Sequence, residues 1–202
     1  MANAKPATAK GRAMRDRIVQ AGAELIAEKG VAGMSLDDVR ERTGASRSQL
    51  YHYFEDRDDL VRAVIDVTTE TVLDNQGELL YHLDSWAGID RWLDALVQHQ
   101  IGQQACGGCP LGSLAGQIAE RDPDARAAIA VGLDRWEAHL RDGLTRMKAH
   151  GKLRKDGDPA ALATATMASI QGGLLLTQIR RDPDQLRIAL NAARNNLRLA
   201  GA

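Results

Sequence analysis

The chain has 202 residues, a formal net charge of −1, 44% hydrophobic residues and only 3% aromatic residues. This length suits one or two small domains, and the nearly neutral charge excludes a generally basic protein that coats nucleic acid. Since aromatic side chains are scarce, Leu, Ile, Val, Ala and Met must fill the core. The Ala- and Leu-rich composition, with few β-branched runs, predicts an all-α fold.

The sequence also carries signals about location. By inspection no apolar stretch approaches the roughly 18–20 residues needed to cross a bilayer. The N-terminus has no apolar segment after its basic residues, so we do not expect a secretory signal. Two cysteines do not make a disulfide framework. We therefore expect a cytoplasmic protein without a membrane partner.

The first fifty-five residues predict a basic arm and a three-helix domain. Residues 1–11 are small, polar and basic and are expected to be disordered. Over 12–55, one helix ends near Lys29-Gly30 and a second begins at Ser35. Gly44 permits a tight turn, and Ser46 can cap the short helix that follows. The pattern predicts a helix-turn-helix.

The rest of the chain predicts a connecting helix at 56–76 and a larger helical domain at 77–202. Helices are expected at about 89–104, 111–121, 123–149, 158–180 and 183–199. Three of these follow Asp-Pro pairs, namely 122–123, 158–159 and 182–183. Asp is a good N-cap, and Pro suits the first helical position because its missing N–H is not needed there.

The short helix after Ser46 is rich in polar side chains of the kind usually exposed to solvent. Arg forks onto guanine and Gln onto adenine in the major groove, whereas hydroxyl groups and helix N-termini suit phosphates. Leu50 and Phe54, four residues apart, are expected to face the core. An ordinary packed helix pair is the alternative, in which the polar side chains are simply solvated. We favour binding to double-stranded DNA.

A family resemblance becomes specific at this point. Residues 15–65 resemble the DNA-binding domain of the TetR family of bacterial transcriptional regulators. The matching motifs are Arg17-Ile18-Val19-Gln20-Ala21-Gly22-Ala23-Glu24-Leu25-Ile26, Glu28-Lys29-Gly30, Met34-Ser35-Leu36-Asp37-Asp38-Val39, Gly44-Ala45-Ser46-Arg47-Ser48-Gln49-Leu50-Tyr51-His52-Tyr53-Phe54 and Asp58-Asp59-Leu60. Arg40 departs from the pattern, because the family usually has a small residue there. The segment Gly108–Leu114 resembles more weakly a subgroup that includes regulators of multidrug and flavonoid response genes.

The resemblance implies a homodimeric repressor that binds a near-palindromic operator and is released by a small effector held in the C-terminal domain. It also implies that Tyr51 contacts phosphate. Together with the side-chain chemistry, it gives these candidate DNA contacts: Ser35, Ser46, Arg47, Ser48, Gln49, Tyr51, His52, Tyr53 and Arg57. Arg47 and Gln49 are the candidates for base contacts. The basic arm (Lys5, Lys10, Arg12) is expected either to enter the minor groove or to act as a solubilising tail.

The sequence suggests an apolar effector pocket with a few polar groups in the C-terminal domain. The candidates are Trp92, Leu96, His99, Cys106, Leu111, Trp136, Met167, Gln171 and Leu175. Trp92, Leu96, His99 and Cys106 are expected to lie roughly on one helix face. For each residue, ordinary core packing is the alternative. A regulator without a small ligand would instead have a fully packed C-terminal domain.

Cys106 and Cys109 form a C-x-x-C pair. Structural packing, thiol sensing and metal binding are all compatible with it, although a zinc site would need two further ligands. A redox-sensing regulator of the same fold is therefore an alternative, and a thiol oxidoreductase is an alternative of another class. We find no catalytic motif and expect no enzyme activity, cofactor or metal.

The last two helices, residues 158–199, are expected to form the dimer interface. The first is apolar nearly all round, which requires a partner. Leu186, Leu190, Ala193 and Leu197 are expected to extend this surface on the second. Two such helices from each subunit would form a four-helix bundle. An intramolecular core is the alternative.

Overall fold

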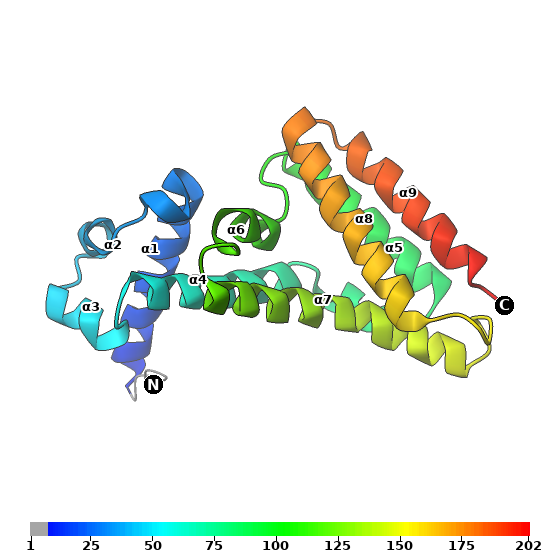
Figure 1. The fold of residues 1–202 in the computed structure, drawn as a ribbon, viewed down its shortest axis with the longest axis horizontal. Coiled ribbons are helices and arrows are strands. Elements are labelled where there is room, and N and C mark those ends of the chain that lie inside the picture. The colour runs from blue at the N-terminus through cyan, green and yellow to red at the C-terminus, as the bar shows by residue number, and fades with distance from the viewer. Residues whose placement is uncertain (1–7) are drawn as a thin grey trace. The chain divides into compact units, whose positions relative to one another are not determined.

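The structure is a computed structural model that describes residues 8–202 (Figure 1). Within this range the chain forms helices and loops but no strand, and one isolated bridge pairs Leu153 with Gly201. The predicted all-α fold is confirmed.

The helices follow the predicted order. They are α1 (Ala9–Gly33), α2 (Leu36–Thr43), α3 (Arg47–Tyr53), α4 (Arg57–Asp74), α5 (Trp86–Gly102), α6 (Pro110–Ile118), α7 (Pro123–Ala149), α8 (Pro159–Arg180) and α9 (Asp184–Leu199). A 3-10 helix, η1 (Gly77–His82), was not predicted. The Asp-Pro starts of α7 and α8 are confirmed, whereas α9 begins one residue later than expected, at Asp184. Asp122, Asp158 and Asp182 each accept a backbone N–H two residues later at 2.9 Å.

The arm predicted at residues 1–11 overlaps the first helix by three residues. Helix α1 begins at Ala9, because the Thr8 hydroxyl oxygen accepts the Gly11 N–H at 3.1 Å and caps it. Lys10 and Arg12 therefore lie on a helix, and Lys5 lies outside the described residues.

The described residues form two compact units. The N-terminal unit comprises the residues up to Thr71 together with Leu114–Gly132, and the C-terminal unit comprises Val72–Ser113 and Leu133–Ala202. The end of α6 and the first turns of α7 thus belong with the helix-turn-helix. The boundaries of 12–55, 56–76 and 77–202 as functional domains stay a prediction.

The N-terminal unit has a continuous apolar core under α3. Ile18 and Leu25 of α1 and Leu60 of α4 are at most 1% exposed. A Cβ atom at Gly22 would lie 3.2 Å from a methyl group of Val64, so glycine lets α1 and α4 approach closely. Phe54 is 1% exposed, and the guanidinium of Arg15 on α1 lies 5.4 Å from its ring centroid. Phe54 therefore holds α3, which carries most of the candidate DNA contacts and is called the reading helix, on α1, and its expected place in the core is confirmed.

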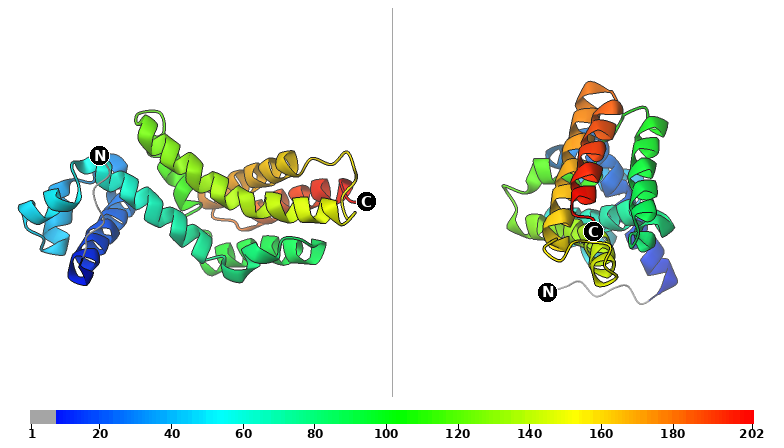
Figure 2. Two further views of the ribbon diagram at one scale, coloured as in Figure 1. Left: turned by 90° about the horizontal axis from the view of Figure 1, so that it is seen from below. Right: turned by 90° about the vertical axis from the view of Figure 1, so that its right-hand side faces the viewer.

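In the C-terminal unit, α8 and α9 lie antiparallel beside α5 (Figures 1 and 2). A Cβ atom at Gly173 would lie 2.8 Å from Leu186 Cδ1, so glycine permits the close packing of α8 on α9. On the other side of α9, Arg194 pairs with Asp90 and Asp94 of α5 at 2.9 and 2.6 Å.

Four residues of α9 do not have the expected role. Leu186, Leu190, Ala193 and Leu197 are at most 5% exposed within a single subunit, so they form its own core. The expectation that these four extend the dimer surface is wrong, because the i, i+4, i+7 stripe that they make is covered by the same chain.

Helix α8 has the predicted bounds, but it is long and apolar enough to test the expectation about membrane-spanning stretches. Its 22 residues include a window with a mean hydropathy of 1.3, enough by length and composition to cross a membrane. The expectation that no stretch approaches that length is therefore wrong, because Ala, Gly and Thr add to Leu and Ile without a charge. Core helices of water-soluble proteins pass the same test, so this helix is weak evidence of a membrane span.

We predict that Phe54→Ala lowers the free energy of unfolding by about 3–5 kcal/mol, the usual cost of removing a buried aromatic ring. Urea denaturation measures this change. Tyr51→Ala, at a side chain that is 48% exposed, is the control and should shift stability by no more than about 0.5 kcal/mol. Equal losses for both variants would contradict the anchoring role of Phe54.

Candidate DNA-binding site and effector region

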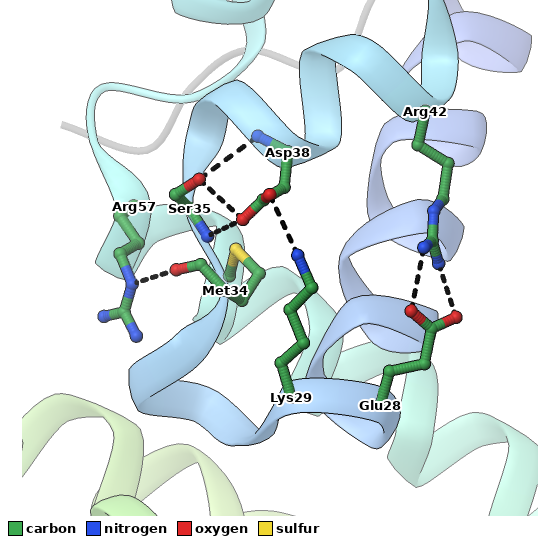
Figure 3. Close-up of polar contacts among 7 residues, drawn as sticks. All are labelled: Glu28, Lys29, Met34, Ser35, Asp38, Arg42 and Arg57. Carbon is green, nitrogen blue, oxygen red and sulfur yellow. Dashed lines mark hydrogen bonds and ion pairs between the residues drawn. The ribbon is translucent and has the colours of Figure 1, made fainter.

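A capping box defines the start of α2. The Ser35 oxygen accepts the Asp38 N–H and the Asp38 carboxylate accepts the Ser35 N–H, each at 3.1 Å. The same carboxylate accepts a hydrogen bond from the Ser35 hydroxyl at 2.7 Å and pairs with Lys29 of α1 at 3.0 Å (Figure 3). These contacts, led by the Ser35 hydroxyl, lower the pKa of Asp38 to about 2.

A second ion pair fastens the end of α2 to α1. The two terminal guanidinium nitrogens of Arg42 donate one hydrogen bond each to the two carboxylate oxygens of Glu28, both at 2.8 Å (Figure 3). The hydrogen bonds from Arg42 lower the pKa of Glu28. The pair is exposed, so its bidentate geometry fixes orientation more than it adds stability.

The turn between α2 and α3 is closed by Gly44, which has a left-handed backbone with φ 68°. Its N–H donates to the Arg40 carbonyl at 2.9 Å. Thr43 is buried, and its hydroxyl donates to the Val39 carbonyl at 2.8 Å. A guanidinium N–H of Arg17 donates to the Thr43 carbonyl, so α1 also grips the turn. The predicted helix-turn-helix is therefore present.

Helix α3 starts with a second capping box. The Ser46 oxygen accepts the Gln49 N–H at 3.1 Å, and Gln49 Oε1 accepts the Ser46 N–H at 2.9 Å. Leu50 is 2% exposed and lies on the core side. The candidate contacts Ser46, Arg47, Ser48, Gln49, Tyr51 and His52 are exposed together, and Tyr53 is half-buried. The structure thus brings most of the predicted DNA contacts onto one short helix.

Several candidate contacts are already ordered by neighbours. The Arg47 guanidinium lies 5.8 Å from the centroid of the Tyr51 ring, and the rings of His52 and Tyr53 meet edge to face at 5.0 Å. Gln49 Oε1 serves the capping box, so an adenine contact would share this oxygen with the Ser46 N–H. The base and phosphate contacts themselves stay predictions.

Arg57 has an internal role that the sequence did not reveal. Its Nε donates to the Met34 carbonyl at 2.9 Å (Figure 3). A second nitrogen donates to the Val31 carbonyl, and the third pairs with Asp58 at 3.0 Å. Ser35 is likewise engaged in its capping box. Phosphate contacts by Arg57 and Ser35 stay predictions, but both side chains already hold the domain together.

The structure divides the candidate effector residues into buried and exposed groups. Trp92, Leu111, Trp136 and Met167 are at most 6% exposed, and Leu96 and Gln171 are intermediate. His99 and Cys106 are exposed, and Leu175 is 55% exposed. Since α5 ends at Gly102, the expectation that Cys106 shares a helix face with Trp92 is wrong.

Three buried polar atoms of this region have no hydrogen-bond partner within the described part of the chain, namely Trp136 Nε1, Gln100 Oε1 and Gln171 Nε2. By contrast, Trp92 Nε1 donates to Gln76 Oε1 at 2.8 Å. Buried polar groups are nearly always paired, so each exception needs a water or ligand partner. Gln100 was not among the predicted residues. Effector binding by the predicted set stays a prediction.

The two cysteines have different surroundings. Cys106 is exposed, and its sulfur accepts a hydrogen bond from Arg181 at 2.8 Å. Cys109 is 7% exposed, and burial raises the pKa of its thiol, partly offset by the hydrogen bond from the Gly112 N–H. A neutral, buried thiol attacks slowly. Across residues 8–202, no group of three or more His, Cys, Asp or Glu side chains is placed to hold a metal ion.

The fold and the exposed reading helix define a helix-turn-helix DNA-binding protein. Residues 18–64 match the family described as bacterial regulatory proteins of the tetR family, and residues 86–193 match the tetracyclin repressor-like C-terminal domain. These matches cover more than half of the chain, which therefore belongs to the TetR family of transcriptional regulators.

Individual relatives agree with this assignment. The chain is 28% identical over 175 residues to an HTH-type transcriptional regulator from the lacX 3′ region of Lactococcus lactis subsp. lactis, which covers 85% of this chain and 86% of the relative. It is 21% identical over 178 residues to the HTH-type transcriptional repressor DhaR of Mycobacterium sp. (strain GP1), covering 86% of each chain. A TetR family regulator from Cytophaga hutchinsonii has the same fold, with a TM-score of 0.81, 19% identity and coverage of 98% and 99%.

We predict that acid weakens the helix-turn-helix through Asp38. A carboxyl group whose pKa is lowered by folding, here from 3.8 to about 2, stabilises the fold above pH 4, and this stabilisation is lost as the pH falls toward 2. Asp38→Asn should therefore lose less stability between pH 5 and pH 2.5 than the wild type does. Urea titrations at both pH values measure this difference, and identical pH dependence would contradict the assignment. Asp37→Asn is the control, because it removes a carboxylate from the same first turn of α2 without breaking the capping box.

Proposed function

We propose that the protein is a transcriptional repressor that binds a near-palindromic operator as a homodimer in the cytoplasm and leaves it when a small, largely apolar effector binds. The main observation behind this proposal is that α3 exposes polar side chains on one face while Leu50 and Phe54 are buried beneath it. The family supports the wider proposal, since DhaR, a relative over most of the chain, is named a repressor.

A dimer surface is supported by the outer face of α8. The exposed residues of this helix recur at helical spacing and combine small with large apolar side chains. They include Ala161, Ala165, Ala168, Gly172, Leu175, Leu176 and Ile179. Ile188 and Leu199 continue the exposed apolar surface on α9, at 64% and 77% exposure. Small residues allow helices to approach closely, and burying this face against a second copy would form the four-helix bundle.

Effector binding is supported by the unpaired indole N–H of Trp136 and the unpaired Oε1 of Gln100. A hydrogen-bond acceptor on a small molecule would pair with the indole N–H, and a donor would pair with the amide oxygen. Trp92, Leu111 and Met167 supply apolar surface in the same unit. An effector that prefers a dimer with the wrong spacing of reading helices lowers operator affinity by linkage. Helix α4, which follows the reading helix directly, is the proposed lever.

We predict that Arg47→Ala changes which operators are preferred, whereas Tyr51→Phe weakens binding to all operators alike. A lost guanine contact costs about 1–3 kcal/mol at that base pair only, while a phosphate contact carries no sequence information. Titrations over a set of operator variants measure both effects. An unchanged ranking for Arg47→Ala would refute the base contact.

We also predict that Ile179→Glu produces a monomer, because a charge would be buried within an apolar interface. Sedimentation at several concentrations measures the mass. Val131→Glu, at an α7 residue that is 59% exposed, is the matched control and should remain dimeric. A dimeric Ile179→Glu variant would move the interface elsewhere.

A further inference from the structure

The connection between α1 and α2 is irregular and determines where the helix-turn-helix begins. Gly30 has φ 76° and ψ 167° and breaks the regular helix three residues before α1 ends. Met34 is extended, and Ser35 then caps α2. The direction in which α2 and α3 leave α1 therefore depends on how residues 30–35 are held.

Side chains from two other helices hold this connection. From α4, Arg57 donates to the carbonyls of Val31 and Met34. From α6, Gln117 Oε1 accepts the Val31 N–H at 2.7 Å. Val31 and Met34 are 4% and 2% exposed, so these bonds lie at the edge of the core. A Cβ atom at Gly30 would lie 3.0 Å from Gln117 Oε1, so the absence of a side chain there lets Gln117 reach the backbone.

Helix α6, which carries Gln117, makes a second set of contacts at its first turn. Within α6, Leu114–Ile118 belong to the unit that contains the helix-turn-helix, while Pro110–Ser113 belong to the C-terminal unit. There, a Cβ atom at Gly112 would lie 3.0 Å from Gln171 Oε1, and the Gly112 N–H donates to the Cys109 sulfur. A nine-residue helix is about 13 Å long, so α6 joins the Gly112 contacts to Gln117 through one short helix.

We propose that Gln117 is a positioning residue for operator binding, which acts by fixing the α1–α2 connection through the Val31 N–H. The inference rests on the proposed function and adds a specific route for its regulation. An effector that shifts the first turn of α6 would loosen this hydrogen bond and release the reading helix from its DNA-binding orientation. The route runs to the start of α2 and is separate from the lever motion of α4.

The test uses the full-length protein and the duplex that it selects from random DNA. Gln117→Leu removes the acceptor at similar volume, Gln117→Glu retains an acceptor oxygen, and Gln103→Leu alters an exposed glutamine elsewhere. Gln117→Leu should weaken operator binding about fivefold, the factor expected for one intramolecular hydrogen bond. Gln117→Glu should recover most of the loss, and Gln103→Leu should bind like the wild type.

A second measurement separates coupling from a merely structural role. Amide hydrogen exchange is followed over residues 30–35 and 109–118, with and without the operator duplex. Because coupling is reciprocal, operator binding should slow exchange in both segments of the wild type, but only in 30–35 of Gln117→Leu.

Each result has a clear meaning. Wild-type affinity in Gln117→Leu, or the same operator-dependent protection of 109–118 in that variant, would overturn the role of Gln117. A wild-type protein that selects no duplex would instead overturn the proposed function on which this inference rests.

Discussion

The reading helix is only seven residues long, and an isolated helix of that length is not stable in water. Its shape must therefore come from its surroundings. The Ser46–Gln49 capping box satisfies its first N–H groups, and burial of Leu50 and Phe54 fixes its inner face. The outer face is then free to carry polar side chains without any cost to the core. DNA recognition in this protein depends on that division between a buried base and an exposed polar surface.

Charged residues around the reading helix also have structural roles. Arg57, a cation that the sequence suggested for phosphate, donates to two backbone carbonyls of the α1–α2 connection. Asp38 caps α2 and pairs with Lys29, and Arg42 pairs with Glu28 (Figure 3). Residues on α1, α2 and α4 therefore set the orientation of the reading helix. Because these groups are charged and largely exposed, their contribution is to direction more than to stability.

Local chemistry made much of this predictable from sequence. Caps at Ser35, Ser46 and the Asp-Pro pairs indicated several helix starts, since capping involves neighbours two or three residues apart. Contacts between distant segments were invisible. Nothing in the sequence linked Gln117 to Val31. The stripe Leu186, Leu190, Ala193 and Leu197 looked like a subunit interface because periodicity shows that a face is buried but not by which chain. The prediction that Cys106 continues the face of α5 failed because Gln104 and Ala105 adopt left-handed backbone conformations. Non-glycine residues rarely adopt this conformation, so the sequence did not indicate it.

The central claim is that two copies of α3 read DNA together. Selection of bound duplexes from a random pool, followed by sequencing, tests it most directly. The account predicts an enriched inverted repeat whose half-site centres lie about one helical turn apart, roughly 10–10.5 base pairs, or a multiple of it. Enrichment of a single unrepeated half-site, or no enrichment at all, would contradict it.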